Sequence, residues 1–521
     1  MEKSPSAKNI LFITTDQQHW RTLGFRNPEL KTPNLDRLAA RGCCFPRAYT
    51  VNPTCTPTRC SWLTGTYPSQ HGAYSLGTKL FENVPTVNDE FRKENIRTCL
   101  IGKAHFQPLA STPEYPSLEA YPVLHDLDFW RKYDGRFYGF DHVELARNHT
   151  DESHVGQHYA LWMESKGYAN WRDYFLPNPP CYRSASDRWQ ESPHRSPEPG
   201  GAWEIPEEIH YDAWIAERTG AMLETYRRSG ERFFLWASFF DPHPDYMVPE
   251  PYASMYDPAT VTVPEFTPGE FDDKPPHFGM TQQRHPDFSG YRTDEGSNAL
   301  HGACSHRMDR ATKAKRIATM YGMVTMLDTY IGKILDRLES LGLAEETLIV
   351  FTSDHGDFWG QHGLIAKALH HYEDLLRVPL IAALPGRIPA GTENPDLQST
   401  VDLAPTFLSF AGVPVPRHMT GVDRQSNWCG DHAAARKHVI VENHHNPTTF
   451  HAETLITDRY KITVYRNADY GELFDLDADP GELVNLWDHP ECRELKQKLL
   501  LEFLQARMET EPMPMPRIAG A

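Results

Sequence analysis

The sequence predicts an α/β fold with a mostly parallel sheet covered by helices on both faces, followed by a smaller C-terminal α+β domain. Continuous apolar runs of strand length alternate with longer segments whose apolar residues recur at helical spacing, a pattern typical of parallel-sheet proteins. After about residue 436 the pattern changes to short strand-like runs separated by turn residues, which favours antiparallel strands. At 521 residues the chain is long enough for more than one domain. We predict residues 1–430 as the first and 431–521 as the second.

Four apolar, β-branched runs have no charged interruptions, as expected of strands that are buried on both faces. They are residues 9–15, 233–240, 347–352 and 378–383. The segments with helical spacing predict helices between and around these strands. They are residues 34–41, 209–228, 311–341 and 401–411.

The C-terminal part has a different pattern, of short strands followed by a helix. We predict antiparallel strands at 437–442, 452–456, 460–465 and 472–475, and a closing amphipathic helix at 490–508.

Two long segments in the first part show little periodicity. Residues 108–201 and 249–308 are rich in proline and aromatic side chains. Structureless loops of this length are uncommon in compact domains unless they are functional. We interpret both as insertions that shape the mouth of a pocket, with surface decoration as the alternative.

Composition limits the classes of function. The formal net charge of −18 argues against broad binding to nucleic acid or to an anionic membrane, although a local basic pocket remains compatible with it. The nine cysteines have no short repeated spacing, so they predict neither a disulfide framework nor a zinc site. Because no apolar stretch of signal-peptide or membrane-spanning length is present, we expect a cytoplasmic protein, or a periplasmic or secreted one if a leader was removed.

The most informative segment runs from Cys55 through Thr56, Pro57 and Thr58 to Arg59, and continues into a Leu-Thr-Gly sequence. Pro57 has a fixed φ and no N–H, so we expect an extended loop around the cysteine. If a helix opens here, Arg59 places a permanent cation one turn from Cys55. The alternative is a buried structural thiol beside a proline turn.

Two aspartates follow buried strands, where ligand sites of α/β sheets lie. Asp16 comes after the first strand and precedes Gln17, and Asp354 comes after the strand at 347–352 and precedes His355. Together these side chains suit a divalent cation, because hard cations prefer oxygen ligands. For either aspartate taken alone, a helix N-cap is the favoured alternative.

Three further segments carry candidate catalytic groups. Lys103 and His105 follow the strand-like segment 97–101, and we expect both side chains on one face of an extended segment. His243 lies between two prolines after the strand at 233–240, and a histidine there can donate a proton to a departing alkoxide. Lys367 lies upstream of the strand at 378–383. For Lys103 and His105 the alternative is a surface lysine and a half-buried histidine. For the segment around His243 it is a proline-stiffened turn.

These motifs, in this order, resemble the formylglycine-dependent sulfatases of the alkaline phosphatase superfamily. The C-terminal segments 470–476 and 479–486 also look like sulfatase sequence, so the resemblance covers nearly the whole chain apart from the two insertions. It implies an alkaline-phosphatase-like form of the predicted fold. Many members have two adjacent aspartates where this chain has Asp16 and Gln17, and an asparagine where it has His355. The chain is therefore most similar to the Asp-Gln subset, which includes choline sulfatases and phosphonate monoester hydrolases.

The resemblance implies a role for each candidate residue. Cys55 would be oxidised by a formylglycine-generating or other sulfatase-maturing enzyme, and the hydrated aldehyde would be the nucleophile. Its second hydroxyl would later expel the bound anion. The family pattern assigns Arg59 and Lys103 to stabilising this group, His105 to the base, His243 to the leaving-group acid and Lys367 to contacts with the sulfate and the leaving oxygen. One divalent cation, Ca²⁺ first and Mg²⁺ or Mn²⁺ as alternatives, would be bound by Asp16, Gln17, residue 55, Asp354 and His355.

The implied function is hydrolysis of a sulfate monoester of a sugar, an aryl or another small organic alcohol. Phosphonate monoesters and phosphodiesters carry the same single negative charge, so hydrolysis of those esters at the same site is the alternative. A catalytically silent protein that binds sulfated ligands is a second alternative, from a different class. We expect no nucleic-acid partner and no membrane association, and a homo-oligomer is possible.

Overall fold

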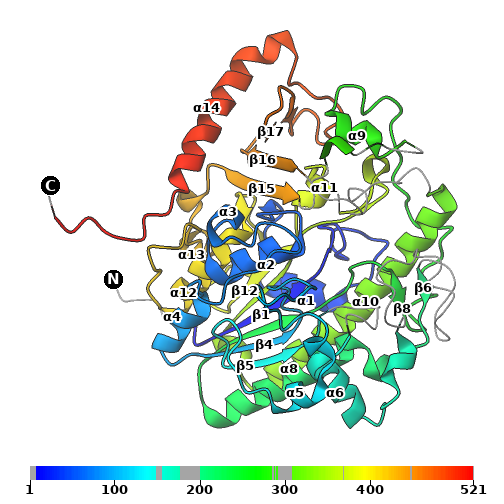
Figure 1. Ribbon diagram of the computed structural model, residues 1–521, viewed down its shortest axis with the longest axis vertical. Helices are drawn as coiled ribbons and strands as arrows, with labels where there is room; N and C mark the ends of the chain where they lie inside the picture. The colour runs from blue at the N-terminus through cyan, green and yellow to red at the C-terminus, as the bar shows by residue number, and fades with distance from the viewer. Residues whose placement is uncertain are drawn as a thin grey trace.

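The computed structural model describes residues 7–147, 155–175, 200–283, 287, 289–291, 308–367, 369–445 and 449–519. The main sheet has eight strands in the order β13-β2-β12-β9-β1-β7-β4-β5 (Figure 1). Its parallel centre consists of β9 (Thr347–Ser353), β1 (Asn9–Thr15), β7 (Phe233–Ser238), β4 (Arg97–Gly102) and β5 (His142–Leu145). At one edge β12 (Leu380–Ala383) runs antiparallel to both β9 and β2 (Cys43–Cys44), and β13 (Thr392–Glu393) pairs with β2. The predicted mostly parallel sheet is confirmed.

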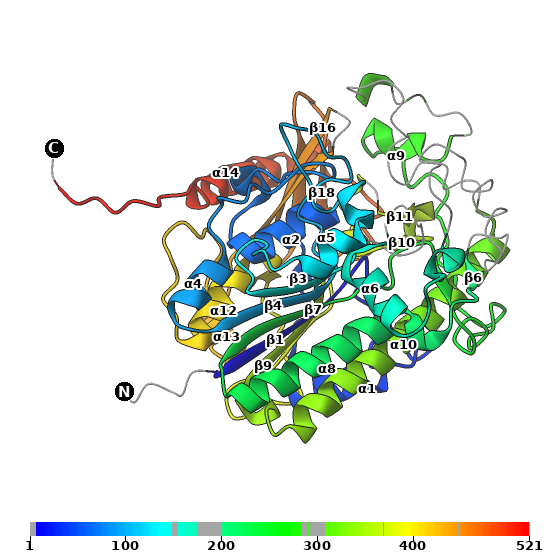
Figure 2. The ribbon, with the colours of Figure 1, turned by 60° about the horizontal axis from the view of Figure 1, so that its bottom comes forward.

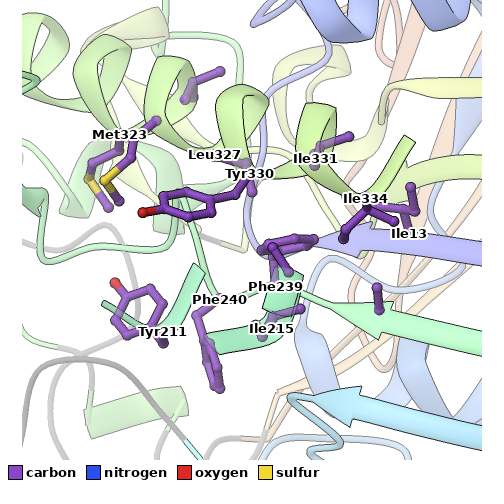
Figure 3. Close-up of a cluster of buried hydrophobic side chains, with 14 of the residues drawn as sticks. Ile13, Tyr211, Ile215, Phe239, Phe240, Met323, Leu327, Tyr330, Ile331 and Ile334 are labelled. Carbon is purple, nitrogen blue, oxygen red and sulfur yellow. The ribbon is translucent and has the colours of Figure 1, made fainter. Parts of the chain in front are cut away.

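Helices cover both faces of this sheet, as the uninterrupted apolar strands predict. On one face lie α1 (Pro33–Arg41), α8 (Tyr211–Ser229) and α10 (Arg310–Ser340), and on the other α2 (Cys55–Thr64), α4 (Val87–Lys93) and α12 (Leu403–Ala411) (Figure 2). Strand β1 serves both layers, because alternate side chains point to opposite faces: Leu11 and Ile13 belong to one core, and Ile10 and Phe12 to the other. Figure 3 shows Ile13 in the first of these cores, where Leu327, Ile331 and Ile334 come from α10.

A smaller antiparallel sheet with one long helix makes up the C-terminal unit. The strands β15 (Val439–His445), β16 (Phe450–Ile456), β17 (Tyr460–Tyr465) and β18 (Gly471–Asp475) pair in sequence order. Helix α14 (Arg493–Glu509) lies beside this sheet (Figure 1). Its Leu499, Phe503 and Ala506 side chains pack into a core with the sheet. The α+β character is confirmed, whereas a domain boundary at residues 430 and 431 stays a prediction.

The C-terminal unit also supports the loop that precedes Cys55. The backbone N–H of Glu442 in β15 donates to the carbonyl of Val51, and the Asn52 side-chain amide donates to the carbonyl of Glu442 at 2.6 Å. The Glu442 carboxylate accepts from the backbone N–H and the hydroxyl of Ser69 at 2.8 and 2.9 Å. The start of α2 is thereby held between the two sheets.

The structure corrects several sequence-based boundaries. Strand β7 ends at Ser238 rather than at residue 240, and β12 begins at Leu380, after the proline at 379 that has no N–H to donate. The larger correction concerns residues 108–201. This segment contains the edge strand β5 and the helices α5 (Leu127–Lys132) and α6 (Gln157–Ser165), so part of it belongs to the main α/β layer. Of the predicted insertion at 249–308, residues 249–283 are described and include the short helix α9 (Pro276–Met280). Most of its residues from 284 onward lie outside the described part of the chain.

Candidate active site

The candidate residues meet at the carboxyl edge of the parallel strands. Asp16 follows β1, Lys103 follows β4 and Asp354 follows β9, and these three strands lie close together in one sheet. Because parallel strands end at the same edge, side chains that are far apart in sequence converge there. Every one of these three side chains is buried, with at most 2% of its surface exposed.

Cys55 is the first residue of helix α2. Pro57 therefore lies in the first turn of a helix, where a missing N–H costs nothing, so the predicted extended loop is wrong. The Cys55 Sγ atom, which stands where the oxygen of a modified side chain would be, lies 3.1 Å from the Lys367 Nζ atom and 3.3 Å from His355 Nε2. It is 3.6 Å from Asp16 Oδ1. Burial and the Asp16 carboxylate raise the pKa of the thiol, so an unmodified Cys55 is neutral here.

Arg59, one turn along α2, joins the ends of three strands. Its Nε donates to Asp354 at 2.9 Å, one NH2 nitrogen lies 3.3 Å from the Asp16 carboxylate, and the other donates to the Ser238 hydroxyl at 2.8 Å. Burial alone would lower the pKa of Arg59, but the two carboxylates outweigh it and raise that pKa. The guanidinium therefore bonds to the two aspartates and to Ser238, and it holds the aspartates in position.

Lys103 forms an ion pair with Asp16 Oδ2, the same carboxylate oxygen that Arg59 approaches. Burial would raise the pKa of Asp16, but Lys103, together with His243, Arg59 and Lys367, lowers it well below its usual value. Asp16 is therefore an ionised carboxylate. The carbonyl of Lys103 accepts from the hydroxyl of Ser238 at 2.7 Å and from Arg59 at 3.2 Å, which fixes the backbone at this point.

Four predicted ligands form one compact buried group. Candidate ligand atoms of Asp16, Cys55, Asp354 and His355 all lie within 4.8 Å of one another. His355 Nδ1 bonds to the carbonyl of Gly356 at 2.8 Å, which places the proton on Nδ1 and leaves the Nε2 lone pair facing the group.

Gln17, the fifth predicted ligand, has a buried side-chain oxygen that is available to a cation. Its side-chain nitrogen donates to Asp357 at 2.7 Å, whereas its Oε1 atom is buried and has no hydrogen-bond partner among the described residues. An orphaned buried oxygen is costly unless something absent from the protein satisfies it. Two carboxylates, an amide oxygen and an imidazole fit a divalent cation, so the donor set agrees with the expected cofactor.

Lys367 contacts both Cys55 and His243. The Lys367 Nζ atom is 3.3 Å from His243 Nε2 and 3.4 Å from His355 Nε2. His243 Nδ1 bonds to the carbonyl of Pro244. Burial, and then the Lys367 charge, lowers the pKa of His243 well below its usual value, so the imidazole is neutral in the free protein.

His105 does not have the expected geometry. We predicted an extended segment in which Lys103 and His105 share one face, but Gly102 has φ = 109° and His105 has φ = 59°, so the chain turns sharply. The His105 side chain is half-buried, and its pKa is lowered well below the usual value, first by desolvation and then by the nearby Arg147 charge. Its Nδ1 atom has no hydrogen-bond partner among the described residues.

Sequence analysis missed four side chains that support the site. Ser238 bonds to Arg59, and Asp357 orients Gln17. Glu119 and Arg147 form a buried ion pair beside His105, with N···O at 3.1 Å. Only Asp357 lies within three residues of a recognised motif, so for the others no local signal in the sequence announces the role.

The other histidines near Lys367 in sequence contact different groups. His362 bonds to Glu270 and Asp374, and His371 bonds to Thr454 at 2.6 Å. His370 packs against Phe278, with ring centroids 4.4 Å apart. A structural role for these three side chains agrees with their contacts.

Comparison with known proteins agrees with this geometry. A family model described as Sulfatase matches residues 8–413, and a second, described as N-sulphoglucosamine sulphohydrolase, C-terminal, matches residues 360–509. The chain belongs to the sulfatase family. This sulfatase-family chain is accordingly an enzyme of the sulfuric ester hydrolase class within the alkaline phosphatase superfamily.

Two curated relatives and one solved structure show which proteins this chain is similar to. It is 28% identical over 520 residues to an arylsulfatase of Clostridium perfringens, covering 96% of this chain and 95% of the other. It is 25% identical over 492 residues to a choline-sulfatase of Rhizobium meliloti, covering 92% and 83%. A phosphonate monoester hydrolase from Silicibacter pomeroyi superposes with a TM-score of 0.77 at 23% identity, covering 97% and 96%, which establishes the shared fold. Among the described residues, no helix has the length and apolar character to cross a membrane.

The contacts of His362 predict a pH-dependent contribution to stability. Burial would lower the pKa of His362, but hydrogen bonds to Asp374 and Glu270 outweigh it and raise the pKa to about 9. Because this exceeds the unfolded value of about 6.5, the stabilisation is complete below pH 6.5 and is lost as the pH rises through 9. An upper bound on its size is about 3 kcal/mol. We expect His362→Gln to be less stable than the wild type at pH 6 and to approach it near pH 9.5. Chemical denaturation at several pH values measures this difference, and a constant gap across the range would contradict it.

Proposed function

We propose that the chain hydrolyses a sulfate monoester through a formylglycine at residue 55 and one divalent cation. The observation that carries this proposal is the position of Cys55 at the start of α2, between Lys367, His355 and Asp16. A sugar, aryl or small organic alcohol is the proposed leaving group. We further propose a modifying enzyme that oxidises Cys55, a cytoplasmic location and a possible homo-oligomer.

The charge balance supports an anionic substrate. Asp16 and Asp354 neutralise a dication, after which Arg59, Lys103 and Lys367 leave the site positive. This local excess can attract a tetrahedral monoanion although the whole chain carries a net charge of −18. When bound, a divalent cation supplies Lewis-acid polarisation of an anion oxygen. Ca²⁺ is the first candidate, with Mg²⁺ and Mn²⁺ as alternatives, because most of the ligand atoms are oxygens.

Lys367 and His243 can deliver the proton that the leaving alcohol requires. The Lys367 Nζ atom lies 3.1 Å from the Cys55 Sγ atom and 3.3 Å from His243 Nε2. Because His243 Nδ1 is held by the carbonyl of Pro244, Nε2 is the nitrogen that faces Lys367. A proton can therefore pass between these two groups and reach the alkoxide while the lysine contacts the sulfate oxygens.

His105 is proposed as the base of the second step. It removes a proton from the remaining hydroxyl of residue 55, the carbon–oxygen bond to the sulfate breaks with its electron pair leaving on the sulfate, and the aldehyde reforms. The neutral state that burial gives His105 is the state that this role needs.

Hydrolysis of phosphonate monoesters or phosphodiesters is the second candidate. It is favoured by the Asp16–Gln17 pair and by the fold shared with a phosphonate monoester hydrolase. A relative in Trinickia caryophylli, 27% identical over 520 residues, is named a multifunctional alkaline phosphatase superfamily protein. We rank the sulfate ester first, because the relatives of this chain include an arylsulfatase and a choline-sulfatase.

A panel of matched esters tests the ranking. We expect kcat/KM on the best sulfate monoester to exceed that on the phosphonate and phosphodiester with the same alcohol. Residual activity on those analogues is expected, because each carries a single negative charge on a tetrahedral centre and the same cations stabilise it. A higher value for a phosphonate or phosphodiester would make the second candidate correct.

Replacement of Cys55 tests the nucleophile. We expect Cys55→Ala to abolish turnover without loss of fold, because alanine offers no oxidisable side chain. Cys60→Ala, on the same helix and equally buried, is the matched control and should remain active. Mass spectrometry of the Cys55 peptide should find an aldehyde in the wild type. Turnover by Cys55→Ala would refute the mechanism, and an active wild type with an intact thiol would do the same. Absence of both turnover and aldehyde would favour the silent binding protein.

Metal content tests the ligand set. We expect chelation to remove activity and the double variant Asp16→Ala/Asp354→Ala to lose bound metal, as measured by elemental analysis of the purified protein. Asp374→Asn is the control, because this half-buried aspartate contacts His19 and His362 instead. A stoichiometric metal ion in the double variant would show that the site lies elsewhere.

The leaving-group dependence tests His243. We expect His243→Ala to lose far more activity on alkyl sulfates than on nitrophenyl sulfate, because an activated aryl alcohol needs little protonation. The expected difference between the two losses is on the order of 10². Equal losses on both substrates would exclude His243 from proton transfer.

A further inference from the structure

We propose that the buried pair of Glu119 and Arg147 positions His105 for the second half-reaction, release of sulfate from residue 55. This inference rests on the proposed function, because it concerns the base of that reaction. Neither residue belongs to the sequence motifs of the site, and both come from residues 108–201, which sequence analysis interpreted as an insertion.

The Glu119 carboxylate collects three consecutive backbone donors. One oxygen accepts from the N–H of His105 at 2.8 Å, and the other accepts from Phe106 at 2.9 Å and Gln107 at 2.8 Å. Successive N–H groups point in one direction only when the chain curls around an anion. The curl here requires φ = 59° at His105, a conformation that costs a non-glycine residue on the order of 1 kcal/mol. The Glu119 carboxylate therefore stabilises the turn at His105 by accepting its three backbone N–H groups.

Arg147 fixes Glu119 relative to the sheet. Leu145 of β5 pairs with Gly102 of β4, and the N–H of Ala146 donates to the carbonyl of Gly102 at 3.3 Å. Arg147 thus emerges beside Lys103, and its guanidinium bonds to the same Glu119 oxygen that holds the His105 N–H, at 3.1 Å. The base and its support are anchored to two adjacent strands.

The pair is buried, so its role is not that of a surface ion pair. Glu119 is 1% exposed and Arg147 is 3% exposed. Buried ion pairs contribute little net stability, because desolvation offsets their attraction. What the pair does supply is geometry, together with a cation close enough to lower the pKa of His105 and keep the base neutral. A positioning role fits both features.

Glu119→Gln tests the inference, with Glu144→Gln as the matched control. Glu144 also lies on the β5 side of the sheet, is 7% exposed and pairs with Arg218 at 2.8 Å, but it does not contact the His105 segment. In Glu119→Gln we expect the first turnover to release alcohol at the wild-type rate and the steady-state rate to be at least about tenfold lower, so that alcohol release shows a burst. Mass spectrometry should detect a covalent sulfate on residue 55. Glu144→Gln should show neither the burst nor the adduct.

Arg147 offers a second, independent variant. Arg147→Met should show the same burst, and Arg147→Lys should recover part of the steady-state rate, because the ammonium restores the charge without the planar fork. Hydrogen exchange should be faster at His105, Phe106 and Gln107 in Glu119→Gln than in Glu144→Gln, which reports the loss of the turn without any assay of activity.

The outcomes separate this inference from the proposed function. If the wild type does not turn over a sulfate ester, the proposed function fails and the inference with it. If the wild type is active but Glu119→Gln slows alcohol release itself and accumulates no adduct, only the positioning role is overturned. Unchanged hydrogen exchange at His105 in a folded Glu119→Gln would overturn it as well.

Discussion

The site depends on one buried interaction, the guanidinium of Arg59 between the carboxylates of Asp16 and Asp354. Two ionised carboxylates this close would repel each other in a dry interior, and the cost of burying them is prohibitive without a compensating charge. Arg59 supplies that charge at 2.9 and 3.3 Å and simultaneously ties the ends of β1 and β9 to helix α2. Since Cys55 begins the same helix, the interaction that neutralises the aspartates also places the proposed nucleophile.

The rest of the protein can be understood as support for that arrangement. Parallel strands β1, β4, β7 and β9 bring their carboxyl ends to one edge, and helices on both faces make this sheet rigid. The C-terminal sheet holds the loop before Cys55 through hydrogen bonds from the Glu442 backbone to the Val51 carbonyl and from the Asn52 side chain to the Glu442 carbonyl. A rigid frame of this kind holds charged groups in place without reorganisation during the reaction, which is the main source of electrostatic catalysis.

The contacts divide the proposed catalytic side chains into two groups. Lys367 and His243, which contact each other, form the group proposed for protonation of the leaving alcohol. Lys103 and the turn at His105 form the group proposed for release of the anion, and Glu119, paired with Arg147, accepts from the backbone of that turn. This division gives residues 108–201 a part in the site that neither the pocket-mouth interpretation nor surface decoration anticipated.

The sequence by itself determined the fold class, the family and the identity of the candidate ligands and catalytic residues, because these depend on local patterns. Apolar runs without interruption indicate strands buried on both faces, and strand-terminal motifs place Asp16, Lys103 and Asp354 at one edge. Only the tertiary structure decided that α2 begins at Cys55, that His105 lies in a left-handed turn, and that Glu119 and Arg147 support it. The physical reason is that a four-residue edge strand such as β5 carries too little periodicity to be recognised, and the partner of a buried charge is set by which strands are neighbours in the sheet. That neighbour relation involves residues separated by tens to hundreds of positions, which no local pattern encodes.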